Sequence, residues 1–252
     1  MAVRVSVVTV SVAANLARVK TSISAAASRA GRRAEDVRLL LVTKTVPPEI
    51  VQQAIVAGQD YLGENKVQEG LAKASALAAQ PLRWSMIGHL QRNKVRDVLR
   101  FASEVQSIDR VRLAAEMEKH LQKAGEQIDV LVQVNTSGEE SKYGVAPAGV
   151  MTFLKELAAF DCLRPKGFMT LATFTPDEAE VRRCFRLLRD IRDRARNDAN
   201  QGGDLHHLSM GMSGDFEWAI EEGATIVRIG QAVFGPRSKP DSYYWPNATL
   251  AV

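Results

Sequence analysis

The chain has 252 residues, of which 46% are apolar and 25% are charged, and its formal net charge is +4. This composition excludes a disordered or collagen-like chain, and the length is typical of one α/β barrel. The 33 basic and 29 acidic residues nearly balance, so we expect no nucleic acid among the partners.

The first predicted element is a helix over residues 12–30, because Leu16, Val19 and Ile23 fall on one face and Gly31 follows as a stop signal. Eight short apolar stretches come after it, and each is typical of a strand that is buried on both faces. They are residues 38–44, 60–65, 83–88, 104–109, 129–135, 164–171, 206–212 and 225–230. Each interval between them can hold a helix.

Three of these helices have a predicted capping residue at their start. Residues 175–178, Thr-Pro-Asp-Glu, read as a capping box at the start of the longest helix, residues 176–198. Asp109 is expected to cap the helix that carries Val111. Ser213 is expected to cap the short helix over residues 215–222.

Strands that alternate with helices eight times imply parallel strands joined by right-handed crossovers. We therefore predict an α/β fold of the (β/α)₈ TIM-barrel type, preceded by the N-terminal helix. Residues 1–252 would form a single domain, with the barrel over about residues 36–237. An open, doubly wound sheet is the alternative, although no G-x-G-x-x-G motif follows the first strand.

Lys44 stands at the carboxyl end of the first predicted strand, after an unbroken apolar run from Leu39 to Val42 and then Thr43. Ligands of α/β folds collect at this end of the strands. The lysine is therefore either a solvated charge at a strand end or an amine held in a pocket for covalent chemistry with a carbonyl group.

An anion site is predicted where the seventh and eighth strands end, because barrels often bind phosphate there with the help of a short helix N-terminus. Ser213 and the N–H groups beside it can bind an anion, and Gly230 lets the backbone approach a phosphate closely. Alternatively, Ser213 is only a helix cap and Gly230 only a tight turn.

An amine beside a phosphate cradle suits a phosphorylated aldehyde. Pyridoxal 5′-phosphate (PLP), held as a Schiff base on Lys44, is the obvious candidate. A sugar-phosphate aldolase that uses the same lysine without PLP is the competing chemistry.

Eight motifs resemble those of the pyridoxal phosphate homeostasis protein family, which is related to the barrel domain of alanine racemase. The resemblance extends over nearly the whole chain, and together these motifs are highly specific. They are Val42–Lys44, Gly63–Glu69, Ile87–Lys94, Val134–Thr136, Glu140–Gly144, Gly167–Thr170, Leu208–Asp215 and Val227–Gly235. One departure is visible, because the family usually has Trp-His where this chain has Trp84-Ser85.

The resemblance implies a PLP site in which Lys44 carries the Schiff base and Arg228 lies by the pyridine nitrogen. The remaining implied contacts are Ser213, Gly230 and Gln231 at the phosphate, and Asn65 and Met210 near the ring. No metal is implied.

Arg228 bears on what such a site can do. A guanidinium keeps its proton and so discourages protonation of the pyridine nitrogen, which makes the ring a weaker electron sink. Alanine racemase adds a tyrosine base from a second domain, and this chain ends soon after the barrel. We therefore expect a protein that carries and buffers PLP in vitamin B6 and amino-acid homeostasis. The alternative is a racemase-like enzyme with weak activity.

The expected partners are PLP and the PLP-dependent apo-enzymes that receive it, and the expected state is a monomer. Cys162 and Cys184 form no C-x-x-C pair, so reduced thiols and a cytoplasmic location are expected. The apolar N-terminal stretch is shorter than a membrane span, and we expect no membrane partner.

Overall fold

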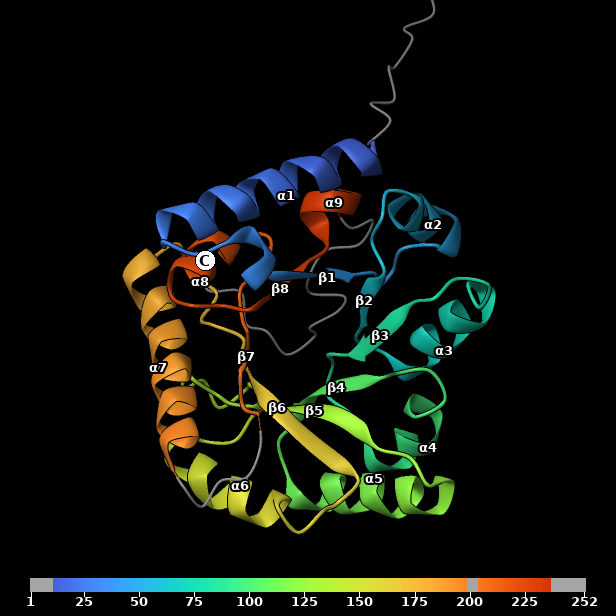
Figure 1. Cartoon of the computed structure of the whole chain (residues 1–252), viewed down its shortest axis with the longest axis vertical. Helices are drawn as coiled ribbons and strands as arrows, with labels where there is room; N and C mark the ends of the chain where they lie inside the picture. Colours follow the sequence, from blue (N-terminus) through green and yellow to red (C-terminus); the bar gives the residue numbers. More distant parts are fainter. Residues whose placement is uncertain (1–10, 199–203, 237–252) are drawn as a thin grey trace, which may run out of the picture.

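The computed structural model describes residues 11–198 and 204–236 (Figure 1). Within these residues, parallel strands pair in chain order from β1 to β8, and β8 pairs with β1 to close a barrel. The strands are β1 Arg38–Val42, β2 Tyr61–Glu64, β3 Arg83–Met86, β4 Glu104–Ile108, β5 Ile128–Gln133, β6 Leu163–Met169, β7 His207–Ser209 and β8 Ile226–Ile229. The predicted TIM barrel is confirmed, and each predicted strand overlaps one observed strand.

Helices surround this barrel, as Figure 1 shows. They are α1 Val12–Arg29, α2 Pro48–Val56, α3 Val67–Ala76, α4 Val95–Val98, α5 Val111–Ala124, α6 Val150–Leu157, α7 Glu178–Asn197, α8 Phe216–Glu221 and α9 Gln231–Phe234. Short 3₁₀ turns occupy Ala34–Asp36, Arg92–Lys94 and Pro147–Gly149. No helix within the described ranges is long and apolar enough to cross a bilayer.

Helix α1 packs on the two short helices that follow β7 and β8. Its Asn15 side chain donates a hydrogen bond of 2.9 Å to the carbonyl oxygen of Val233 in α9. At the other end of α1, Arg29 pairs with Glu217 and Glu221 of α8 at 2.7 and 2.8 Å. Helix α1 therefore holds α8 and α9 in place, and these two helices adjoin the loops of the predicted phosphate cradle.

Two predicted helix caps are wrong. Helix α7 begins at Glu178 and is capped by Asp177, whose carboxylate accepts from two backbone N–H groups of the first turn. The Thr175 hydroxyl instead accepts from the N–H of Asp177 at 3.2 Å. Helix α5 has Arg110 at its N-cap position, and Asp109 forms an ion pair with Arg110 instead of capping the helix. At α7 the Asp177 carboxylate takes the capping role that was predicted for Thr175. At α5 Arg110 engages the Asp109 carboxylate that was predicted to be the cap.

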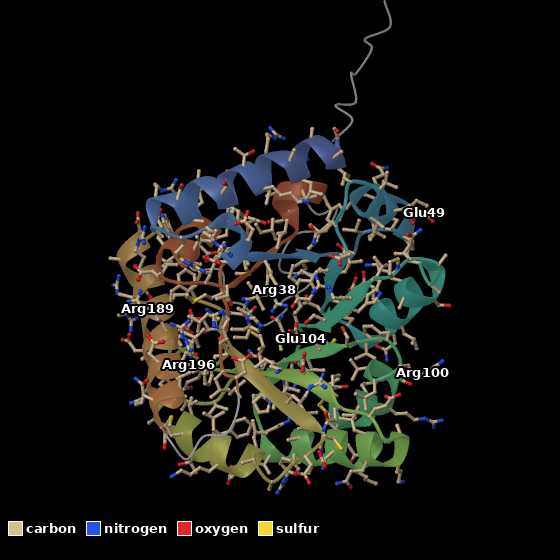
Figure 2. All side chains as sticks on the ribbon, in the orientation of Figure 1. Arg38, Glu49, Arg100, Glu104, Arg189 and Arg196 are labelled. Carbon is tan, nitrogen blue, oxygen red and sulfur yellow. The ribbon has the colours of Figure 1, made fainter. Side chains whose placement is uncertain are left out.

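Side chains fill the barrel interior, as in other closed eight-stranded barrels. The apolar ones form a small cluster that is separate from the larger core between strands and helices: Leu40, Val42, Tyr61, Leu131, Met169 and Ile226. Figure 2 shows Arg38 and Glu104 inside the ring of strands, whereas Arg189 and Arg196 of α7 lie on the outside. The interior therefore combines an apolar layer with charged groups.

His207 gives the fold a predicted pH dependence. Burial, and secondarily the positive charge of Arg38, lowers the pKa of His207 to about 4. The folded state therefore favours the neutral ring, so its contribution to stability is present above the ordinary histidine pKa and is lost as the pH falls toward 4. Because the ring is only partly buried, we expect wild type to lose on the order of 1 kcal/mol more than His207→Gln between about pH 7 and about pH 5.

Urea unfolding at several pH values measures this difference. His120→Gln is the matched control, because His120 is also a partly buried histidine, paired with Glu116 on the outer helix α5. Identical pH profiles for wild type and His207→Gln would contradict the expectation.

Candidate functional site

Lys44 lies in the turn that follows β1, at the carboxyl end of the barrel, and its side chain is half-buried. The next residue, Thr45, has φ +65°, a left-handed conformation that is uncommon for a β-branched residue. The turn that carries the predicted imine lysine is therefore conformationally strained.

Asn65 follows β2 directly, and its side-chain oxygen is buried without a hydrogen-bond partner among the described residues. The chain just after β3 comes very close to the backbone of Asn65, because a Cβ on Gly88 would lie 2.2 Å from the main-chain carbonyl oxygen of Asn65. A buried acceptor without a donor is costly, so this position favours a bound group that can satisfy it.

Arg228 of β8 is 4% exposed, and its guanidinium donates to the Ser209 hydroxyl at 2.8 Å and to the carbonyl oxygen of Thr170 at 2.7 Å. Its backbone N–H donates to the carbonyl oxygen of Gly211, so the loop after β7 is tied to β8. Met210, between Ser209 and Gly211, is fully buried. Burial lowers the pKa of Arg228 to about 10, which still leaves the guanidinium charged at neutral pH.

A chain of hydrogen bonds leads from Arg228 across the barrel interior. The Ser209 hydroxyl donates to the Gln106 side-chain oxygen at 2.6 Å, and the Gln106 amide donates to Glu104 at 2.7 Å. Glu104 also accepts from the Tyr61 hydroxyl at 2.5 Å. The Glu104 carboxylate is thus the buried acceptor at the far end of this hydrogen-bond chain.

Ser85, which stands where the family usually has histidine, belongs to the same interior network. Its hydroxyl is fully buried and donates to Glu104 at 2.8 Å. The position therefore faces the barrel interior and supports Glu104.

The loops after β7 and β8 meet, as predicted for a phosphate cradle. The Ser213 hydroxyl accepts from the N–H of Ala232, in the first turn of α9, at 3.3 Å. Gly230 is the N-cap residue of α9, and Gln231, its first residue, is exposed. The predicted cap of the following helix by Ser213 is wrong, because α8 begins only at Phe216 and has Asp215 at its N-cap position.

This cradle is adjacent to the end of β1. A Cβ on Gly230 would lie 3.0 Å from the carbonyl oxygen of Val42, two residues before Lys44. The structure therefore brings the backbone of the predicted cradle next to the strand end that precedes Lys44, across the β8–β1 pairing.

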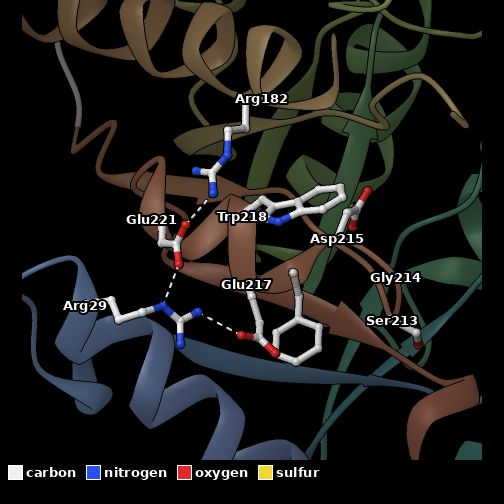
Figure 3. A pocket seen from close by; sticks show the side chains of 9 residues that line it. Arg29, Arg182, Ser213, Gly214, Asp215, Glu217, Trp218 and Glu221 are labelled. Carbon is white, nitrogen blue, oxygen red and sulfur yellow. Dashed lines mark hydrogen bonds and ion pairs between the residues drawn. The ribbon is translucent and has the colours of Figure 1, made fainter. Parts of the chain in front are cut away.

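A cavity of about 360 Å³ lies behind this cradle, between α1, α7 and α8 (Figure 3). Arg29 and Arg182 point toward Glu221 from opposite sides of it, and both form ion pairs with that carboxylate. The cavity shares Ser213 with the cradle but is not lined by Lys44, Asn65 or Arg228. It therefore adjoins the predicted cradle but does not include the predicted imine lysine.

A buried ion cluster, which was not predicted from the sequence, lies next to the turn that carries Lys44. Lys73 of α3 is 4% exposed and lies 2.7 Å from both Glu64 and Glu69. Burial raises the pKa of Glu64. The i, i+4 spacing of Glu69 and Lys73 was a readable signal of a helical ion pair, but it gave no sign of the burial.

A family model for the N-terminal domain of alanine racemase matches residues 14–238. A pyridoxal phosphate homeostasis protein of Aquifex aeolicus (strain VF5) is 43% identical over 222 residues, which cover 88% of this chain and 96% of that protein.

Two solved structures are also similar to this chain. A protein of unknown function from Bifidobacterium adolescentis has a TM-score of 0.86 and 37% identity, with 89% of this chain and 94% of that chain covered. PipY of Synechococcus elongatus PCC7942, solved with PLP bound, has a TM-score of 0.78 and 29% identity, with 89% of this chain and 100% of that chain covered. This chain therefore belongs to the pyridoxal phosphate homeostasis protein family, which shares its barrel with the N-terminal domain of alanine racemase.

Proposed function

We propose that this protein binds PLP on Lys44, carries and buffers it, and so contributes to vitamin B6 and amino-acid homeostasis. The observation that carries the proposal is the contact between the ends of β8 and β1, where a Cβ on Gly230 would lie 3.0 Å from the Val42 carbonyl oxygen. One small phosphorylated aldehyde can therefore reach both the anion cradle and the amine.

The residues at the mouth fit the parts of PLP. Lys44 would hold the aldehyde carbon through a reversible C=N bond, and Arg228 would donate a hydrogen bond to the pyridine nitrogen. Asn65 and Met210 would lie near the ring, and the unpartnered oxygen of Asn65 would accept a hydrogen bond there. The phosphate would be held by the cradle: Ser213, Gly230 and Gln231.

The charge of Arg228 supports carriage over catalysis. When bound, PLP supplies an aldehyde carbon and an electron-withdrawing ring. Because the pKa of Arg228 is about 10, its guanidinium donates and does not accept at neutral pH, which opposes protonation of the ring nitrogen. The protein therefore weakens the ring as an electron sink while it holds the cofactor.

We further propose a cytoplasmic monomer that hands PLP to PLP-dependent apo-enzymes. Cys162 and Cys184 are both unpaired in the structure, which suits a reducing compartment. Analytical ultracentrifugation of the loaded protein tests the monomer directly.

Titration with PLP, followed by transfer to an apo-aminotransferase, tests the function. We expect a visible absorption band that saturates at one PLP per chain and then declines as the apo-enzyme gains activity. Alanine and serine enantiomers should not interconvert above the rate of free PLP. Steady racemisation would favour the racemase-like alternative, and a protein that never binds PLP would contradict both functions.

A further inference from the structure

The two backbone groups on either side of Lys44 are both held by side chains of α3. On one side, the carbonyl oxygen of Thr43 accepts a hydrogen bond from the ammonium group of Lys73. On the other, the N–H of Thr45 donates to the carboxylate of Glu69. Glu69 and Lys73 are one helical turn apart and contact each other at 2.7 Å. A single helical ion pair thus holds both neighbours of the proposed imine lysine.

This ion pair is anchored in the barrel wall. The Lys73 side chain is 5% exposed, and its ammonium group also donates to Glu64, which is fully buried, at 2.7 Å. Glu64 in turn accepts from the Thr43 hydroxyl at 2.5 Å. The three acceptors of Lys73 match the three N–H donors of an ammonium group, so the cluster is built around a charged lysine.

The held turn is one that a free chain would seldom adopt. Thr45 has φ +65°, and a β-branched residue takes this conformation only when its surroundings impose it. The contact with Glu69 is the one hydrogen bond that the described structure shows for the Thr45 N–H. The turn also has a backbone hydrogen bond of its own, from the Val46 N–H to the Thr43 carbonyl oxygen at 3.0 Å. That bond does not engage the Thr45 N–H, so the cluster adds the contact that fixes the strained residue next to Lys44.

We propose that Glu69 and Lys73 form a positioning clamp, which fixes the Lys44 turn so that the Lys44 amine meets the PLP aldehyde. This inference rests on the proposed function. Formation of the linkage consumes the aldehyde and an unprotonated Lys44 amine and releases one water. The clamp takes no part in that exchange and acts only through the orientation of Lys44.

Two probes separate positioning from general binding. PLP reports linkage formation through its absorption band, whereas pyridoxamine 5′-phosphate has no aldehyde and reports only the phosphate and ring contacts. The variants are Glu69→Gln and Lys73→Met. The matched control is Glu118→Gln, because Glu118 is a buried carboxylate on α5 that accepts from the backbone N–H of Cys162 at 3.0 Å, away from Lys44.

We expect both clamp variants to form the linkage about tenfold to hundredfold more slowly in stopped-flow absorbance, because a displaced reacting group loses rate on that scale. Their affinity for pyridoxamine 5′-phosphate should stay within about twofold of wild type, and Glu118→Gln should match wild type in both measurements. Thr45→Gly keeps the ion pair and the N–H that donates to Glu69, and glycine adopts φ +65° without strain, so this variant should form the linkage at the wild-type rate. Glu69→Ala, which removes the acceptor of the Thr45 N–H, should be as slow as Lys73→Met and serves if Lys73→Met does not fold.

Unchanged linkage rates in folded Glu69→Gln and Glu69→Ala would overturn the clamp while leaving the PLP-carrier proposal intact. An equal loss of pyridoxamine 5′-phosphate affinity and linkage rate would also overturn it, because the cluster would then serve only the general structure of the site. A wild type that binds neither probe would overturn the carrier proposal and the clamp together.

Discussion

Lys44→Ala is expected to abolish the covalent attachment of PLP and to weaken its retention by about a hundredfold or more. Lys44 is the half-buried lysine just after β1, and Gly230 of the proposed phosphate cradle approaches the last residue of that strand, Val42. Without its amine, only hydrogen bonds and phosphate contacts remain, and these exchange freely with solvent. Gel filtration of PLP-loaded protein, read by the visible absorption band, measures the loss.

Lys66→Ala is the matched control for that experiment. Lys66 follows Asn65 at the same end of the barrel and is exposed, so its removal should leave the absorption band unchanged. If Lys44→Ala still retained a stoichiometric band through gel filtration, the cofactor would be anchored elsewhere.

Arg228→Met is expected to cost about 3 to 5 kcal/mol of unfolding free energy, because two charge-assisted hydrogen bonds in a buried site are lost together. The Ser209 hydroxyl and the Thr170 carbonyl oxygen would each lose a donor, and the buried hydrogen-bond chain through Gln106 to Glu104 would lose its first member. Denaturant unfolding monitored by circular dichroism measures the change.

Arg189→Met provides the comparison for this loss. Arg189 also bonds a carboxylate and a carbonyl oxygen of Glu222, but it lies on the outer face of α7 with its side chain 33% exposed. Because solvent screens such contacts, we expect a loss below about 1 kcal/mol. Equal losses in the two variants would mean that the interior network does not depend on Arg228.

The sequence predicted the barrel well, because each strand is a short apolar run whose length and spacing report burial on both faces. β1 shows this most clearly, since Leu40 and Leu41 are fully buried on opposite faces of the strand. β7 shows the limit, because the predicted stretch 206–212 contains a strand of only three residues, His207–Ser209. The glycine after Met210 has φ +91° and ends the extended backbone there.

The candidate site was predictable as a set of strand ends but not as a set of contacts. The meeting of Ser213 with Ala232 followed from barrel topology, since neighbouring strands bring their loops together. The chain from Arg228 to Glu104 did not, because Ser209 and Gln106 are 103 residues apart and only the closed barrel joins them. The Glu69–Lys73 pair was visible as a helical spacing, but its contact with the Lys44 turn depends on how α3 packs. The roles of the individual site residues in holding PLP stay predictions.

Borohydride reduction of the PLP-loaded protein, followed by peptide mass mapping, tests the central claim most directly. Reduction turns the reversible C=N bond into a permanent C–N bond and so marks the lysine that carries the cofactor. We predict one phosphopyridoxyl group per chain on the peptide that contains Lys44, with Lys73 unmodified. Modification of another lysine, or an unmodified chain that nevertheless binds PLP, would contradict the account.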